Sequence, residues 1–233
     1  MACRSCSFLV AALTASSTCL SAESAQSKPS VAIVTGEVRN PASREVAFTF
    51  TPPSGLGSSD ESAALDSLNR FTLELPVSRG ILVRGYFDSG QPGWEWARSI
   101  GSFLFDHHPL VFFAEPGDSL HIAIDAGYFA PSFSFSGPDA DNSRFIAEWI
   151  PRFLHFHLEY EGLELEDFKR QADQRRREQI EFLAERRGKY SLSPGFIDFA
   201  TAYFSYGWAR SMISYRSAPG RPGRSGPPRR RRR

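Results

Sequence analysis

The stretch LVFFAEPGDSLHIAID, residues Leu110–Asp125, is the most informative part of the sequence for the fold. Its first five residues are all apolar, which predicts a central β-strand. Pro116, Gly117 and Asp118 follow as a tight-turn signal, with glycine where a positive φ is needed and a carboxylate that accepts backbone N–H bonds. We therefore expect a β-hairpin. Its second strand alternates apolar and other residues, with one face formed by Leu120, Ile122 and Ile124.

Short alternating runs on both sides of this stretch are typical of a β-sandwich. A loop rich in Pro, Gly and Ser, residues 52–62, separates two of these runs. We expect an α+β fold, with an antiparallel β-sandwich of about seven or eight strands followed by about three α-helices. The further strands are expected at residues 31–39, 45–51, 71–75, 81–87 and 94–105, and around Phe133 and Phe135.

The apolar period changes from that of a strand to that of a helix after Gly137. Asp139, Asp141 and Asn142 offer N-cap oxygens for a first helix, which Pro151 is expected to kink or interrupt. A second, highly charged helix is expected at residues 164–187. Its expected i,i+4 ion pairs are Glu166–Arg170 and Asp173–Arg177.

Ser193 and Pro194 predict the start of a third helix, as N-cap and first helical residue. This helix carries a wide apolar stripe between Phe196 and Trp208. The stripe must pack on the sandwich or on a following domain, and without that domain we expect exposed apolar surface. That surface would promote homo-oligomerisation or poor solubility. The stripe is formed by Ile197, Ala200, Phe204 and Trp208.

Composition divides the chain into four regions: a signal peptide at residues 1–25, a β-sandwich domain at 26–136, a helical segment at 137–216 and a disordered Pro/Gly/Arg tail at 217–233. The tail holds seven arginines from residue 219 onward, so 20 of the 27 basic residues remain against 26 acidic ones, a net charge of −6. This acidic body argues against specific nucleic-acid binding by the folded part. The tail itself is interpreted as a non-native coding remnant rather than a ligand for nucleic acid or anionic lipid.

The first 25 residues combine Arg4 with an apolar run and small residues near Ala22 and Ala25, which predicts export to the periplasm or another extracytoplasmic compartment. Lipid anchoring through Cys19 is the alternative, although Thr18 is a poor match to such signals. The chain has 3 cysteines, and all of them lie in this segment. No later segment reaches the roughly 20 apolar residues that cross a bilayer.

Residues 110–125, together with FSFSGPDADNSRFI at residues 133–146, resemble the N-terminal region of bacterial exported thioredoxin-like thiol-disulfide oxidoreductases of the TlpA and AhpC/TSA type. The resemblance covers residues 31–215 and implies a β-sandwich, helices and then a thioredoxin domain with a C-x-x-C site. Here the arginine-rich tail follows instead, so the resemblance implies truncation or frameshift before the redox domain. With no cysteine after Cys19, the mature chain has no thiolate nucleophile.

Candidate sites are few. Trp94 and Trp96 would project from one face of a strand as a stacking platform for a sugar or peptide, although two core tryptophans are the favoured interpretation. Asp118 and Ser119 have no histidine and acid in an order that would complete a catalytic triad. The carboxylate pair Glu115 and Asp118 is better explained as part of a β-turn than as a glycosidase site. No metal site is expected, because adjacent or i,i+2 histidines chelate poorly. Those histidines are His107, His108, His155 and His157. No catalytic residue and no cofactor are expected either.

The sequence therefore predicts a non-catalytic envelope module that binds or positions an unidentified protein or peptide partner. The alternative is a free-standing carbohydrate- or peptide-binding sandwich that uses Trp94 and Trp96. An enzyme with an unrecognised site is the third hypothesis.

Overall fold

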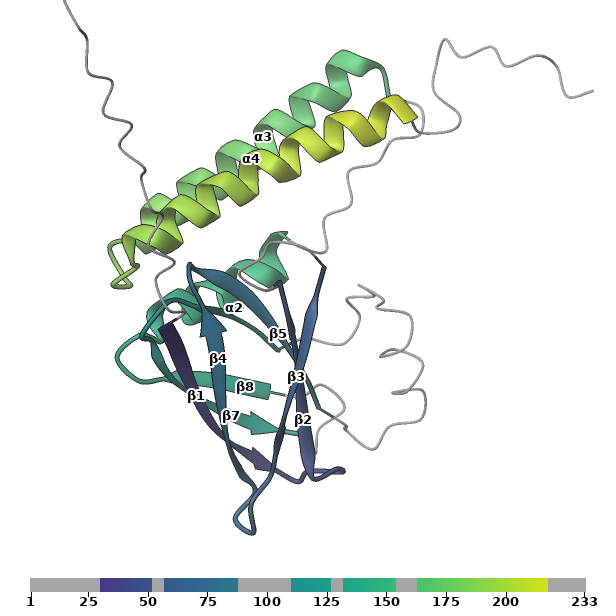
Figure 1. Ribbon diagram of the computed structural model, residues 1–233. Coiled ribbons are helices and arrows are strands. Elements are labelled where there is room, and N and C mark those ends of the chain that lie inside the picture. Colours follow the sequence, from purple (N-terminus) through teal and green to yellow (C-terminus); the bar gives the residue numbers. More distant parts are fainter. Residues whose placement is uncertain (1–29, 52–56, 88–109, 127–131, 154–162, 218–233) are drawn as a thin grey trace, which may run out of the picture.

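In the computed structural model, residues 30–51, 57–87, 110–126, 132–153 and 163–217 are described, and they form two four-stranded sheets and three helices (Figure 1). The predicted α+β fold, a β-sandwich followed by helices, is confirmed. One sheet has the order β4-β1-β7-β8, and the other has the order β3-β2-β5-β6. The strands are β1 Ser30–Arg39, β2 Glu45–Phe50, β3 Ser59–Ala64, β4 Arg70–Val77, β5 Ile81–Phe87, β6 Leu110–Ala114, β7 Ser119–Asp125 and β8 Ser132–Ser136.

The sandwich core follows from strict alternation along the strands. In β4, every second residue is buried, and β7 behaves in the same way. Phe48 joins the two sheets, since its ring lies 5.7 Å from that of Phe71 in β4 and 6.1 Å from that of Phe112 in β6. Burying a side chain of this size contributes about 2–3 kcal/mol. The aromatic residues therefore bind the sheets together in a common core.

The predicted hairpin at residues 110–125 is wrong, although both of its strands and its turn exist. β6 pairs antiparallel with β5, whereas β7 pairs with β1 and β8 in the other sheet. The turn therefore carries the chain across the sandwich. Alternation reports which side chains face the core, and it does not report which strand is the hydrogen-bonding partner. The β1–β7 pair is parallel, which also departs from the expected all-antiparallel arrangement.

β6 is buried on both sides, but not because it is central in its sheet; it is last in the order of described strands. One set of its residues, Leu110, Phe112 and Ala114, faces the sandwich core. The other set, Val111 and Phe113, packs under the helices. The continuous apolar run of β6 is therefore explained by its position between two hydrophobic cores.

β3 occupies part of the segment predicted as a loop. Only Ala63 is buried among its six residues SDESAA, so the apolar pattern that marks a strand is missing. β3 is held by its antiparallel pairing with β2 at the margin of the sheet. Polar edge strands resist further pairing, and they are difficult to recognise from sequence for the same reason.

The three helices are α2 Asp141–Phe153, α3 Leu165–Arg186 and α4 Pro194–Ser217. Pro151 lies inside the last turn of α2 and does not end it. The predicted i,i+4 pairs of α3 are wrong. Arg170 pairs with Asp167 at i,i+3, and the Arg177 guanidinium donates to the Gln174 Oε1 at 2.7 Å.

The apolar stripe of α4 is largely covered within the chain: Ala200 and Phe204 are buried, and Ile197 and Trp208 are partly buried. Phe196, Ala200 and Phe204 belong to a second core with α2, α3 and the outer face of β6. The stripe therefore packs on the rest of the chain, and homo-oligomerisation through it stays a prediction. Figure 1 shows α3 and α4 as a long antiparallel pair above the sandwich, with α2 between the pair and the sheets. None of the described helices is long and apolar enough to cross a membrane.

Candidate functional site

The turn between β6 and β7 has the geometry that the sequence predicts. Gly117 adopts a φ of 88°, and the N–H of Asp118 donates to the Glu115 carbonyl at 3.1 Å. The Asp118 carboxylate accepts the N–H of Glu115 at 2.7 Å, as expected for an aspartate that stabilises a turn. The N–H of Ile33 donates to the Asp118 carbonyl at 2.8 Å, which fixes the turn to β1. Pro116 and Gly117 are exposed, and Asp118 is half-buried.

Three polar side chains join this turn to the starts of α2 and α4, and we call them the junction cluster: Glu115, Asn142 and Ser193. The Asn142 amide donates to the Glu115 carboxylate at 3.3 Å and to the Ser193 Oγ at 3.2 Å, and its Oδ1 accepts the N–H of Ser193 at 3.1 Å. The Ser193 hydroxyl donates to Glu115 and accepts the N–H of Phe196 at 3.0 Å. The Ser193 side chain is thus occupied as the N-cap of α4.

Asp118 is the group of the turn whose charged form is disfavoured by its surroundings. Desolvation by burial is the main reason that the pKa of Asp118 is raised from 3.8 to about 6. The Glu115 N–H opposes this shift, while the neighbouring carboxylates of Asp139 and Glu115 reinforce it. Asp139 is itself held in place, because it accepts the N–H of Ser119 at 2.9 Å.

A second charged group joins α2 to the end of α3. Glu148 accepts hydrogen bonds from Arg186 at 2.7 Å, from Tyr190 at 2.5 Å and from Lys189. Desolvation raises the pKa of Glu148, but these three donors outweigh that effect and hold the pKa at about 2. The arrangement ties α2 to the C-terminal end of α3 and to the residues that follow it.

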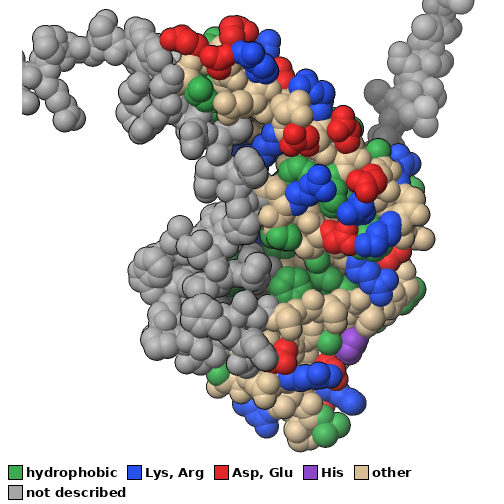
Figure 2. All heavy atoms as spheres, turned by 180° about the vertical axis from the view of Figure 1, so that it is seen from behind, with side chains coloured by type: hydrophobic (Ala, Val, Ile, Leu, Met, Phe, Trp, Pro, Cys, Tyr) green, Lys and Arg blue, Asp and Glu red, His purple; other side chains and the backbone are tan. Residues whose placement is uncertain are grey.

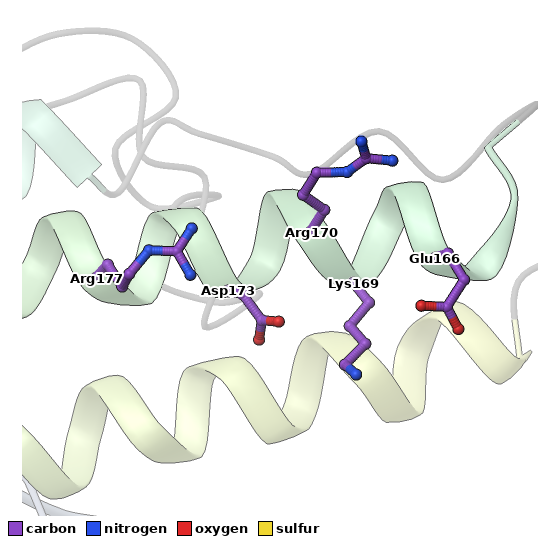
Figure 3. Close-up of a pocket in the computed structure, with 5 residues that line it drawn as sticks. All are labelled: Glu166, Lys169, Arg170, Asp173 and Arg177. Carbon is purple, nitrogen blue, oxygen red and sulfur yellow. The ribbon is translucent and has the colours of Figure 1, made fainter.

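One hollow of about 260 Å³ lies along α3, and its lining is entirely charged (Figure 3). In this view Lys169 extends from α3 toward α4, whereas Arg170 points away from α4. Charges of both signs alternate along the hollow, which is typical of a solvated helix face. Its lining residues are Glu166, Lys169, Arg170, Asp173 and Arg177.

A second hollow, of about 100 Å³, lies where α2, α3 and α4 meet, and we call it the three-helix hollow. Its walls are aromatic: Trp149 stacks on Phe204 at 5.8 Å and meets Tyr203 edge-on at 5.7 Å. Its polar lining includes Arg176 and the buried Gln179. The remaining lining residues are Ala172, Arg175, Gly207, Trp208 and Ser211.

The outer side of α4 carries exposed apolar side chains. Tyr206 and Ile213 are each 67% exposed and are seven residues apart, so they lie about two turns apart on the same side of the helix. Tyr203, three residues before Tyr206 in α4, is 37% exposed. Figure 2 shows the molecule from behind, where acidic and basic side chains are interspersed over the upper part that contains the helices.

Several predicted site residues lie outside the described residues. They are Trp94, Trp96, the four histidines at 107, 108, 155 and 157, and the cysteines with the rest of the signal peptide. The carbohydrate-binding alternative therefore stays a prediction. Within the described ranges, no group of His, Cys, Asp and Glu has the arrangement of a metal site.

The sequence interpretation missed the three-helix hollow and the junction cluster. A signal for the hollow was present, because Gln179 interrupts the buried row of α3 that contains Phe168, Ala172 and Phe182. A polar residue at a core position of a helix usually has a partner or a ligand. The partners of Glu115 are 27 and 78 residues away in the chain, so sequence spacing could not identify that cluster.

Comparisons with known proteins identify no family: no family model matches the chain, and no curated protein matches it. Among solved structures, a Gram-negative toxin is 15% identical with a TM-score of 0.23, and 47% of this chain aligns with 23% of the toxin. A putative cell adhesion protein from Bacteroides ovatus is 10% identical with a TM-score of 0.24, and 47% of this chain aligns with 44% of it. A structure described as a trapped toxin is 9% identical with a TM-score of 0.22, and 46% of this chain aligns with 23% of it. The matched part spans less than half the length of each of these chains, and likenesses this weak carry no argument about function.

Proposed function

We propose that the chain is a non-catalytic, extracytoplasmic module that binds or positions a partner protein through the outer side of α4. The observation that carries this proposal is the exposure of Tyr206 and Ile213, two large apolar side chains on one side of one helix. Tyrosine and other large apolar residues provide much of the binding energy where proteins meet.

The helix that presents these residues is fixed at both ends. Near its start, Phe196 packs edge-on against Phe113 at 5.0 Å and against Phe145 at 5.3 Å. Near its end, the Tyr215 ring stacks on Phe168 at 4.5 Å and its hydroxyl donates to the Leu163 carbonyl at 2.8 Å. A preorganised helix loses little conformational entropy on binding, which favours affinity.

The sequence resemblance supplies the class of partner. Its counterpart region is attached to a thioredoxin-like thiol-disulfide oxidoreductase domain, so a domain of that type is the partner that we propose. All 3 cysteines lie in the predicted signal segment. Thiol chemistry needs a thiolate, so the module would contribute surface while the partner contributes the redox site.

The test is calorimetric titration of the mature chain with an isolated TlpA-type thioredoxin domain. We expect saturable binding, and we expect the double variant Tyr206→Ser/Ile213→Ser to weaken it at least about tenfold, or ~1.4 kcal/mol. Leu68→Ser is the matched control, because Leu68 is 65% exposed in the turn between β3 and β4. No binding, or equal affinity of wild type and double variant, would refute the proposal. So would disulfide reductase activity of the mature chain alone.

A further inference from the structure

We propose that the three-helix hollow is a binding site for a small organic carboxylate with a flat apolar body. Tyr206 and Ile213 are not among its lining residues, and the proposed function does not assign this site. Three features of its lining lead to this ligand class: unpaired buried donors, a positive charge balance and aromatic walls.

Two buried donors on residues that line the hollow have no acceptor among the described residues: the indole Nε1 of Trp149 and the guanidinium Nε of Arg176. Trp149 is only 9% exposed. A buried donor without an acceptor destabilises the folded state, so two of them beside one hollow are a substantial penalty. A ligand with hydrogen-bond acceptors would remove that penalty after small side-chain adjustments.

The charges of the lining select an anionic acceptor. Arg175 and Arg176 carry positive charge, and none of the described residues that line the hollow is acidic. The nearby carboxylate of Asp173 already accepts the indole N–H of Trp208 at 2.8 Å. Arg176 donates to the Ser205 Oγ at 3.1 Å through one nitrogen, so the Nε stays available for a carboxylate. Guanidinium groups bind carboxylates through such paired N–H donors.

Size and shape select a small, flat body. The volume of about 100 Å³ is well below the roughly 300–1,000 Å³ of pockets that hold drug-sized ligands. Trp149, Tyr203 and Trp208 supply ring faces and edges around it. Aromatic walls favour a planar apolar group, and benzoate combines such a group with the required carboxylate.

The test is a titration of the full chain, labelled with ¹⁵N at tryptophan, with sodium benzoate at constant ionic strength. The chain has 4 tryptophans, and the Trp149 indole signal is assigned by its loss in Trp149→Phe. We expect benzoate to shift the Trp149 and Trp208 signals saturably. We expect neutral benzamide to bind at least tenfold more weakly, because it lacks the charge that Arg176 would pair with. A response that does not saturate, or equal binding of benzoate and benzamide, would overturn the inference.

Two variants and a control locate the site. Gly207 lines the hollow, and a Cβ there would have no heavy atom within 4 Å, so Gly207→Leu adds a bulky side chain at the hollow without a clash and also improves helix propensity. We expect this variant to keep its helical circular dichroism and to lose the benzoate shifts. Arg176→Met should weaken benzoate at least tenfold, while Arg177→Met, outside the hollow, should leave affinity unchanged.

Gly207→Leu and Arg176→Met test the same site independently. If Gly207→Leu misfolds, Arg176→Met against Arg177→Met still decides the question, and equal benzoate affinity of those two variants would refute the site. The double variant Tyr206→Ser/Ile213→Ser should bind benzoate normally. Failure of the protein-binding proposal would therefore be distinguishable from failure of this one.

Discussion

Replacing Asp118 with Asn should stabilise the protein at neutral pH. The half-buried Asp118 carboxylate is charged at pH 7.5 in an environment that disfavours the charge, near the carboxylates of Glu115 and Asp139. The hydrogen bond from the Glu115 N–H, 2.7 Å long, requires only an acceptor oxygen, which asparagine also has. The substitution removes the charge and keeps the turn.

The magnitude follows from linkage. The pKa of Asp118 is raised from 3.8 to about 6, and each pKa unit corresponds to about 1.4 kcal/mol, so the upper limit is about 3 kcal/mol. Because Asp118 is partly exposed, solvent screening reduces the expected effect to about 1 kcal/mol. Since the pKa of Asp118 is higher in the folded state, protonation of its carboxylate favours the folded state. This stabilising contribution of the protonated Asp118 is complete below pH 3.8. It is lost as the pH rises through about 6.

The assay is urea unfolding of wild type and Asp118→Asn at pH 4.0 and at pH 7.5. We expect the variant to gain about 1 kcal/mol in the free energy of unfolding at pH 7.5, relative to its difference from wild type at pH 4.0. Asp198→Asn, which removes an exposed carboxylate of α4, is the control and should show no such pH-dependent gain. A variant–wild-type difference that is the same at both pH values would refute the reasoning.

Three further substitutions test the packing of the helices on the sandwich. Phe113→Ala should cost about 3–5 kcal/mol in urea unfolding, because the 1% exposed Phe113 ring packs against Phe196. Phe113→Leu, as control, should cost less than half as much. Ser193→Ala should lower the free energy of unfolding by roughly 1–2 kcal/mol through loss of the α4 N-cap and of the link to Glu115. Ser193→Thr should recover most of that loss, and a neutral Ser193→Ala would contradict the capping role. Glu148→Gln should cost roughly 1 kcal/mol at pH 7. That cost should shrink as the pH falls from 4.5 through about 2, because the lowered pKa makes the Glu148 contribution present above 4.5, and an unchanged cost at pH 2 would count against it.

Much of the fold was predictable because local patterns reflect local physics. A strand at residues 45–51 was predicted from short-range alternation, and in β2 the face that contains Val46, Phe48 and Phe50 is buried throughout. The positive φ of Gly117 and the capping by Ser193 were also predictable, since each depends on a few neighbouring backbone groups. β3 escaped prediction because its sequence carries no apolar alternation.

The candidate sites were less predictable. The aromatic pair Trp94 and Trp96 stood out in the sequence but lies outside the described residues. The three-helix hollow combines Trp149 from α2, Arg176 from α3 and Gly207 from α4, and no spacing rule connects these positions. Such a site exists only after the helices have packed, since its residues come from three different helices.

The sequence by itself determined where most of the described strands, turns and helices lie, β3 excepted, and which of their faces is apolar, because these properties depend on residues within one or two turns of chain. Tertiary structure decided that β6 and β7 belong to opposite sheets and that the apolar stripe of α4 is covered by α2, α3 and β6. The physical reason is that burial of apolar surface is non-directional: it requires every apolar face to be covered and leaves the choice of partner to the packing of the whole chain.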